Sequence, residues 1–298
     1  MSIIDINHLT KDYGNRKGVF DVSIQIEAGE VYGYLGPNGA GKSTTMRHLM
    51  GFCKPQSGTV HILGMNCWSE QKKIQKKLGY LPGEIALPDD MTGWAYLKLI
   101  GKMRGMNSLS YAHELLDFFE INPDTGIKRM SKGMKQKIAI VSAFMHDPEV
   151  LLLDEPTSGL DPLMQNRFIA LVEEAKNKGK TVLLSSHIFE EVEKTCDRVG
   201  MIRNGKLIKE FTDEELQHSK IQTFQLTFEK SDDLQRIKNV YPDSNYDEES
   251  NQLVVSINDS QINDFISQLA ACKLGSLKER KHTLEDYFMQ FYGGGQDD

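Results

Sequence analysis

Short apolar runs alternate with longer helical patterns along much of the chain. The runs at 31–35 (VYGYL), 150–153 (VLLL) and 181–185 (TVLLS) have the length of buried strands. Between the last two, residues 162–178 show helical spacing of apolar side chains, and Gly179 follows as a stop. Buried strands separated by helices are typical of a parallel sheet, so we predict an α/β core.

Residues 93–145 follow a different pattern, because helical segments succeed one another there without an intervening strand. These segments are 94–103, 110–119 and 131–144. Alternating segments that indicate antiparallel strands lie at 3–6, 19–26 and 59–63. We therefore predict two additions to the parallel core, an antiparallel β subdomain and an inserted helical subdomain over about residues 85–148.

The pattern changes again after residue 215. Strands are predicted at 223–228, 253–257 and 274–278, and helices at 232–240, 260–271 and 283–291. Residues 216–298 contain 8 Lys and Arg against 14 Asp and Glu, which gives −6 of the chain's net charge of −7. We predict two domains, 1–215 and 216–298, the second a small acidic accessory domain of α+β type.

The totals exclude several classes of protein. A chain of 298 residues with 39% hydrophobic and 26% charged residues is typical of a water-soluble globular protein, and its negative charge argues against a nucleic-acid partner. The four cysteines form no CxxC pair and the histidines show no ligand spacing, so we expect a cytoplasmic protein without disulfides or zinc. The longest apolar run, 138–145, is far shorter than the roughly 20 residues that span a bilayer, and no signal peptide is visible.

A phosphate-binding loop follows the first predicted buried strand. Its residues match G-x-x-x-x-G-K-[ST] in full: Gly36, Pro37, Asn38, Gly39, Ala40, Gly41, Lys42 and Ser43. The glycines let successive backbone N–H groups face one anion, and the helix that follows adds its positive dipole end. We expect Lys42 to reach the β- and γ-phosphates and Ser43 to ligate Mg²⁺, with Thr44 also at the nucleotide.

Two adjacent carboxylates, Asp154 and Glu155, end the predicted strand 150–153. Neighbouring residues of a strand face opposite sides, so the two carboxylates are expected to have different roles. Asp154 suits the shell of Mg²⁺, and Glu155 suits a general base that deprotonates the attacking water. His187 ends the strand 181–185 at the same edge, where it is expected to hold the water and Glu155 in place.

With three further segments, the sequence resembles the nucleotide-binding subunits of ABC transporters. Residues 131–136 (SKGMKQ) resemble the family signature LSGGQ, residues 158–161 (SGLD) resemble the D-loop, and His187 matches the switch histidine. Tyr13 matches the aromatic residue that stacks on adenine. The resemblance covers about residues 3–210 and includes six motifs in the family order.

This resemblance implies an ATPase that acts as a dimer. The resemblance implies that Ser131 and Gly133 of one subunit contact the ATP bound by the other subunit. Asp161 of the D-loop is expected to lie at the same nucleotide. Residues 1–215 would form the ABC nucleotide-binding domain. Its expected partners are a membrane-spanning permease and a second copy or a related ATPase subunit, at the cytoplasmic face of the membrane, with ATP and Mg²⁺ as the cofactors.

Two positions depart from the family pattern. The signature has Lys132 and Met134 in place of Gly and Gln, a variant similar to the exporter-like branch that serves drug and antibiotic efflux. The Q-loop has Gly83 where the family has Gln, so either Glu84 or water takes that place and no catalytic role is assigned there. The segment 283–288 (TLEDYF) also resembles that branch, and the cargo is expected to be a drug, a peptide or a lipid-like molecule.

Three alternatives remain open at this point. The first is an ABC ATPase that acts on ribosomes or DNA, but such proteins usually contain two cassettes or a long coiled-coil insertion. The second is an importer subunit, because some importers also append small α+β domains. The third is a P-loop kinase, which would leave residues 131–136 and His187 unexplained.

Overall fold

The computed structural model describes residues 2–212, 221–247 and 251–280. The chain divides into two compact units, Met1–Thr212 and Asp213–Asp298. The first unit contains two sheets and the second contains one, and each unit has its own apolar core. The helix predicted at 283–291 and the segment 283–288 lie outside the described residues.

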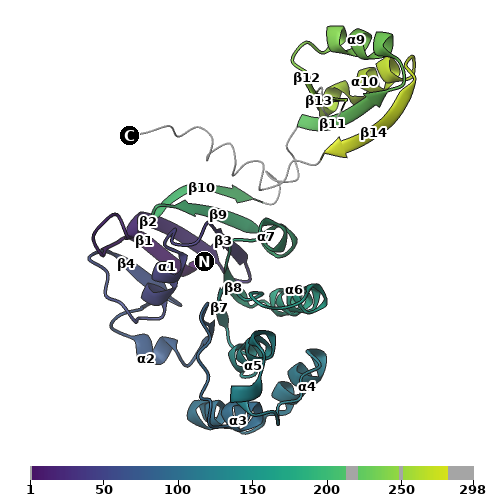
Figure 1. The fold of residues 1–298 in the computed structure, drawn as a ribbon. Helices are drawn as coiled ribbons and strands as arrows, with labels where there is room; N and C mark the ends of the chain where they lie inside the picture. Colours follow the sequence, from purple (N-terminus) through teal and green to yellow (C-terminus); the bar gives the residue numbers. More distant parts are fainter. Residues whose placement is uncertain (1, 213–220, 248–250, 281–298) are drawn as a thin grey trace. The chain divides into compact units, whose positions relative to one another are not determined.

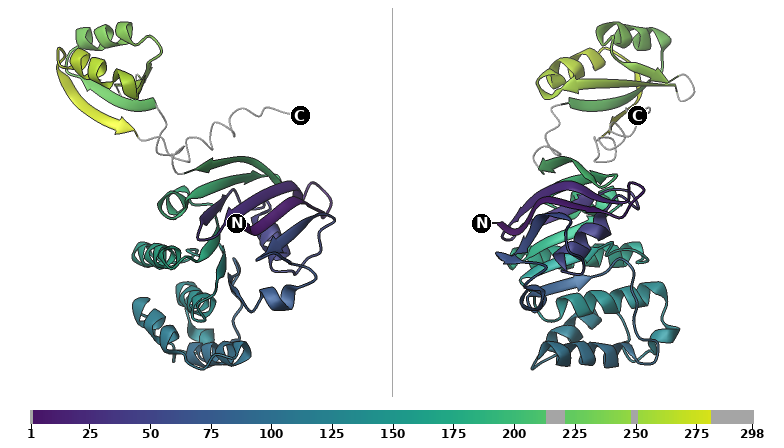
Figure 2. Two further views of the ribbon diagram at one scale, coloured as in Figure 1. Left: turned by 180° about the vertical axis from the view of Figure 1, so that it is seen from behind. Right: turned by 90° about the vertical axis from the view of Figure 1, so that its left-hand side faces the viewer.

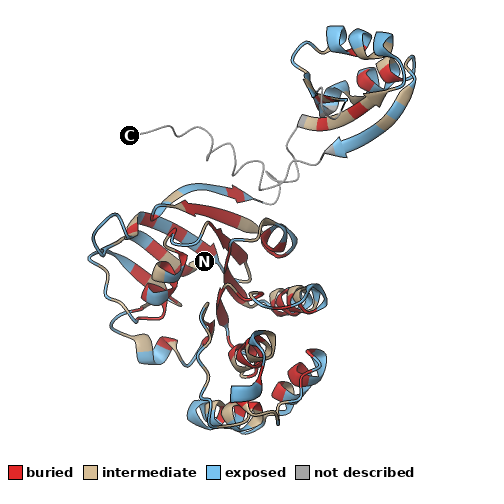
Figure 3. Cartoon of the chain, in the orientation of Figure 1, coloured by how far each residue is buried: buried red, intermediate tan, exposed pale blue. Residues whose placement is uncertain are grey.

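The first unit is organised around a six-stranded sheet with the order β10-β9-β3-β8-β7-β6. Its strands are β3 (Val31–Leu35), β6 (Leu78–Leu81), β7 (Val150–Asp154), β8 (Thr181–Ser186), β9 (Arg198–Arg203) and β10 (Lys206–Thr212). All pairs are parallel except β9 with β10. Every residue of β3, β7 and β8 is buried, which explains why these strands read as unbroken apolar runs (Figure 3).

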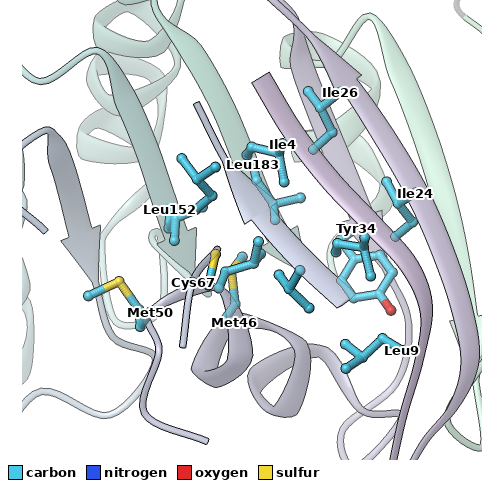
Figure 4. Close-up of a cluster of buried hydrophobic side chains, with 14 of the residues drawn as sticks. Ile4, Leu9, Ile24, Ile26, Tyr34, Met46, Met50, Cys67, Leu152 and Leu183 are labelled. Atoms are coloured by element: carbon cyan, nitrogen blue, oxygen red, sulfur yellow. The ribbon is translucent and has the colours of Figure 1, made fainter. Parts of the chain in front are cut away.

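A second, antiparallel sheet of the order β2-β1-β4-β5 lies against one face of this core (Figures 1 and 2). Its strands are β1 (Ser2–Asp12), β2 (Gly18–Glu27), β4 (Ser57–Ile62) and β5 (Met65–Asn66). Helix α1 (Lys42–Leu49) lies between the two sheets, and all three elements share one apolar cluster. Figure 4 shows part of that cluster, including Ile4 and Ile24 from the antiparallel strands and Leu183 from the parallel ones.

The opposite face of the parallel sheet is covered by α5 (Lys132–Phe144), α6 (Pro162–Asn177) and α7 (Phe189–Thr195) (Figures 1 and 2). The helical subdomain adds α3 (Gly93–Arg104), α4 (Ser110–Phe118) and the short η1 (Ile127–Arg129), and it packs on α5. The predicted parallel core, antiparallel subdomain and inserted helices are therefore all present.

Several elements differ from the sequence prediction. Strand β1 is much longer than the predicted 3–6, because register shifts along its pairing with β2 interrupt the alternation of apolar residues. The short elements α2 (Gln71–Ile74) and β6 and the later α7, β9 and β10 were not predicted. Strand β6 has only four residues, including Gly79, so no periodicity marks it.

The second unit has the element order β11 (Ile221–Phe228), α9 (Ser231–Val240), β12 (Asn245–Asp247), β13 (Gln252–Asn258), α10 (Ile262–Leu269) and β14 (Leu274–Arg280). Its antiparallel sheet has the order β12-β13-β11-β14. A β-α-β-β-α-β chain of this order is the split βαβ arrangement. The predicted helix 260–271 is shorter here, because its first turn is the 3₁₀ segment η2 (Asp259–Gln261).

Candidate functional site

The carboxyl ends of four parallel strands meet at one edge of the six-stranded sheet. Strand β3 leads into the phosphate loop, β6 into Pro82 and Gly83, β7 ends at Asp154, and β8 leads into His187. Open α/β sheets bind ligands at this edge. A cavity of about 770 Å³ opens there, lined by Lys42, Ser43 and Asp154 among others.

The phosphate loop adopts a backbone that only glycine accommodates at its last turn. Gly41, directly before α1, has φ 113°, and a Cβ atom there would lie 2.9 Å from a Val19 side-chain carbon and 3.0 Å from the Gly18 carbonyl oxygen. Within the loop, Pro37, Asn38, Gly39 and Gly41 line the cavity, followed by Lys42, Ser43 and Thr44 of α1. Gly36 and Ala40 do not line the cavity, but their backbone groups hold the loop. The Gly36 carbonyl oxygen accepts from Lys42, and the Ala40 N–H donates to the Pro37 carbonyl oxygen at 3.1 Å.

Lys42 is a buried cation at the centre of this edge, with 5% of its surface exposed. Its Nζ donates to the carbonyl oxygens of Gly36 at 2.6 Å and Pro37 at 3.2 Å. The same atom forms an ion pair with Oε1 of Glu155 at 3.1 Å. A buried ammonium group held by carbonyl oxygens and one carboxylate is ready to exchange these partners for phosphate oxygens.

The side chains of Glu155 and His187 contact each other. The Nδ1 atom of His187 lies 2.5 Å from Oε2 of Glu155, so the two carboxylate oxygens face His187 and Lys42. Glu155 has φ 49°, a left-handed conformation that is costly for a residue with a side chain. Such backbone strain persists where the surrounding structure imposes it and often marks a functional position.

Asp154 is almost fully buried, at 2% exposure, and Oδ1 accepts a hydrogen bond from the hydroxyl of Ser185. Oδ2 lies near Gly83, where a Cβ atom would be 3.1 Å away. Ser43 lines the same cavity, so a hydroxyl and a carboxylate reach one space. Hard oxygen donors of this kind suit Mg²⁺, and the missing side chain at Gly83 leaves room beside them.

Tyr13 lines the outer part of the cavity and is 52% exposed. Its hydroxyl lies 3.6 Å from the sulfur of Cys53, and burial raises the pKa of the phenol above its usual value. The Lys11 ammonium lies 5.6 Å from the ring centroid. The exposed ring can therefore receive a flat ligand.

Ser131 and Gly133 do not line this cavity. Ser131 is the N-cap of α5 and accepts from the backbone N–H of Met134 at 3.2 Å. Gly133 lies close to the D-loop, because a Cβ atom there would meet the Gly159 carbonyl oxygen at 2.7 Å. Lys132 extends over Gly159 and donates to Oγ of Ser158 at 3.0 Å, so the signature turn and the D-loop form one packed surface.

Asp161 caps a helix, a structural function that its place in the D-loop motif does not indicate. Its Oδ1 accepts from the backbone N–H of Met164 at 3.0 Å, which caps α6, and Pro162 occupies the first turn. Asp161 and His187 also lie outside the cavity lining.

The cavity contains side chains that the motifs did not indicate. Arg47, Lys17 and Tyr80 line it together with the phosphate loop. Arg47 follows Ser43 by four residues on α1, so helical spacing alone was enough to place it on the same face. Tyr80 belongs to the unpredicted β6, and burial raises its pKa to about 12.

Within the described residues, no helix combines the length and the apolar character needed to cross a membrane.

Comparison with known proteins identifies relatives of this architecture. The model of the ABC transporter family matches residues 19–158. The bacitracin transport ATP-binding protein BcrA of Bacillus licheniformis is 38% identical over 212 residues, which cover 70% of this chain and 69% of that protein. The linearmycin resistance ATP-binding protein LnrL of Bacillus subtilis is 37% identical over 211 residues, covering 69% of this chain and 68% of that protein.

Similarity also extends over the second unit and to solved structures. The uncharacterized ABC transporter ATP-binding protein YcbN of Bacillus subtilis is 31% identical and covers 98% of this chain and 97% of its own length. A solved ATP-binding subunit of an ABC transporter superposes with a TM-score of 0.66 and 30% identity, over 72% of this chain and 92% of that one.

Proposed function

This chain belongs to the ABC transporter family as an ATP-binding protein, an ATPase coupled to transport, and from that premise we propose that it drives export through a separate membrane permease. Relatives are named for bacitracin transport, linearmycin resistance and Nod factor export, which supports a drug, peptide or lipid-like cargo. The proposed location is the cytoplasmic face of the membrane, where such a permease would hold the protein.

The contact of Glu155 with both Lys42 and His187 supports the hydrolysis of ATP on which the proposed export depends. When ATP enters, Lys42 exchanges its carbonyl and carboxylate partners for the β- and γ-phosphates. Glu155 is then free to orient and deprotonate the attacking water, and His187 keeps the carboxylate turned toward it. Tyr13 receives the adenine ring at the outer end of the cavity, and Arg47 adds positive charge near the phosphates.

The donor set at the base of the cavity fits one Mg²⁺ ion. Ser43 and Asp154 would hold it, and Ser185 fixes the orientation of the Asp154 carboxylate through its hydrogen bond. When bound, Mg²⁺ neutralises phosphate charge. In the Q-loop, Gly83 stands where the family has glutamine, and we propose that water occupies this place. Gly83 lies beside Asp154, whereas the side chain of Glu84, which also lines the cavity, is exposed.

The signature turn is proposed to serve a second copy of the chain. Ser131 and Gly133 lie outside the cavity of their own chain, yet Ser131 is exposed at the N-terminus of a 13-residue helix. A helix N-terminus favours a phosphate group. Two chains placed head to tail would thus enclose two ATP molecules, each between one phosphate loop and the partner's Ser131, with Asp161 at the same interface.

Replacing Ser131 with arginine tests this arrangement. In a Glu155→Gln background, which slows hydrolysis, S131R is expected to abolish the ATP-dependent dimer because a bulky side chain replaces the cap at the interface. ATP binding by the single chain is expected to change by less than about twofold, since Ser131 does not line the cavity. Light scattering measures the mass, and a fluorescent ATP analogue measures the affinity.

The exposed Ser110 at the first position of α4 provides the matched control, and S110R is expected to leave the dimer intact. An unchanged ATP-dependent dimer in S131R would contradict a shared nucleotide site. The permease partner is tested separately, by extracting the tagged chain with detergent and identifying a multi-span protein in the complex.

A further inference from the structure

Glu191 is a buried carboxyl group that the proposed hydrolysis does not use. It lies on α7, directly after the turn that contains His187, and only 5% of its surface is exposed. Glutamate is almost never buried to this extent unless its carboxyl group has specific partners. Its surroundings place it next to the two turns that carry the proposed catalytic residues.

One oxygen of Glu191 holds the turn around His187. Oε2 accepts a hydrogen bond from the hydroxyl of Ser186 at 2.6 Å. The same hydroxyl oxygen accepts from the backbone N–H of Ile188 at 2.9 Å. Ser186 and Ile188 flank His187, so the position of the imidazole depends on this pair of hydrogen bonds.

The other carboxyl oxygen, Oε1, is buried without a hydrogen-bond partner among the described residues. Thr157, which is buried at 4% exposure two residues after Glu155, lines the same small cavity as Glu191. This second turn is closed by its own backbone. The N–H of Ser158 donates to the Glu155 carbonyl at 3.2 Å, and that of Leu160 donates to the Thr157 carbonyl at 3.0 Å. Glu191 is therefore hydrogen-bonded to the turn around His187 and lies next to the turn after Glu155.

The surroundings favour the neutral form of this group. Burial raises the pKa of Glu191 to about 7, and the negative charge of Glu155 acts in the same direction. The neighbouring Cys196 thiol has a raised pKa and is neutral. On the exposed side of α7, Glu190 and Lys194 form an ion pair at 2.6 Å, and the lining that α6 contributes nearby is uncharged.

We propose that Glu191 is a positioning residue that holds the turn of His187 beside the turn of Glu155, through its hydrogen bond with Ser186 and its place next to Thr157. The inference rests on the proposed roles of Glu155 and His187. The neutral carboxyl group accepts from Ser186 without placing a second charge beside Glu155. Ionisation puts two negative charges close together at a buried position, and their repulsion moves the two turns apart. Turnover is therefore expected to fall when Glu191 loses its proton.

Two variants of the full-length chain test this inference. Glu191→Ala is expected to lower kcat by about 10- to 100-fold, because the Glu155–His187 geometry relaxes, while KM for ATP stays within about threefold. Glu191→Gln imitates the neutral acid and is expected to retain kcat at about pH 6. It is also expected to lose the decline above about pH 7 that the wild type shows.

Thermal unfolding separates positioning from simple folding. The pKa of Glu191 is raised in the folded state, so the folded chain loses stability as the pH rises from the usual pKa of a glutamate through about 7. Glu191→Gln is expected to remove this dependence of stability on pH. Turnover is therefore compared per folded molecule. Glu190→Gln, on the exposed side of the same helix, is the control and is expected to behave as wild type.

A wild-type kcat in Glu191→Ala, or a pH profile of Glu191→Gln that superimposes on the wild type, would overturn the inference. In either case the wild-type chain still hydrolyses ATP. A wild-type chain without any ATP turnover would instead refute the proposed function, so the two failures are distinguishable.

Discussion

Replacing Glu155 with glutamine is expected to lower ATP turnover by about 10²- to 10⁴-fold while ATP still binds. Glutamine retains the shape and the contact with His187 but cannot accept the proton of the attacking water. Lys42 also loses the carboxylate that it pairs with at 3.1 Å, which makes it more available to phosphate. ATP affinity is therefore expected to be unchanged or slightly higher.

The measurement combines steady-state turnover with the mass of the chain in Mg·ATP. A dimer is expected to accumulate, because the two enclosed nucleotides are no longer hydrolysed. Glu149→Gln is the matched control, since Glu149 lies just before the same strand and is exposed in an ion pair with Lys77. Turnover close to that of the wild type in Glu155→Gln would remove Glu155 as the general base.

Replacing Lys42 with methionine is expected to affect both binding and turnover. The loss of a charged hydrogen-bond donor to phosphate lowers ATP affinity by about 10- to 100-fold, and kcat falls by about 10²- to 10³-fold. The folded chain is also expected to be less stable, because Oε1 of Glu155 is buried and keeps no cation beside it.

Fluorescent-nucleotide titration and turnover at saturating ATP separate these two effects. Lys54→Met is the control, because Lys54 is exposed on the loop after α1 and does not line the cavity. An affinity for ATP that equals the wild type would show that Lys42 contacts no phosphate. In that case its ion pair with Glu155 would be only a structural contact.

These two variants are expected to differ in their quaternary state. Glu155→Gln traps the dimer, whereas Lys42→Met prevents it by weakening the ligand that joins the two chains. The comparison therefore distinguishes the binding of ATP from its hydrolysis, which a measurement of turnover alone does not separate.

The sequence by itself determined the class of the fold and the main chemical groups. Unbroken apolar runs predicted β3, β7 and β8, because strands buried on both faces need apolar side chains at every position. The phosphate loop, Asp154 and Glu155 are adjacent to these strands in the chain. Their position at the carboxyl edge of the sheet follows from local sequence alone.

Only the tertiary structure decided which of these groups meet. The contact of Lys42 with Glu155, the packing of Gly133 on Gly159 and the place of Glu191 beside Thr157 join separate segments. The order β3-β8-β7-β6 brings Tyr80 and Gly83 into the cavity, although β6 carries no pattern of its own. Periodicity reports which face of an element is buried, but the order of the strands and the packing of helices determine which residues face one another across that core.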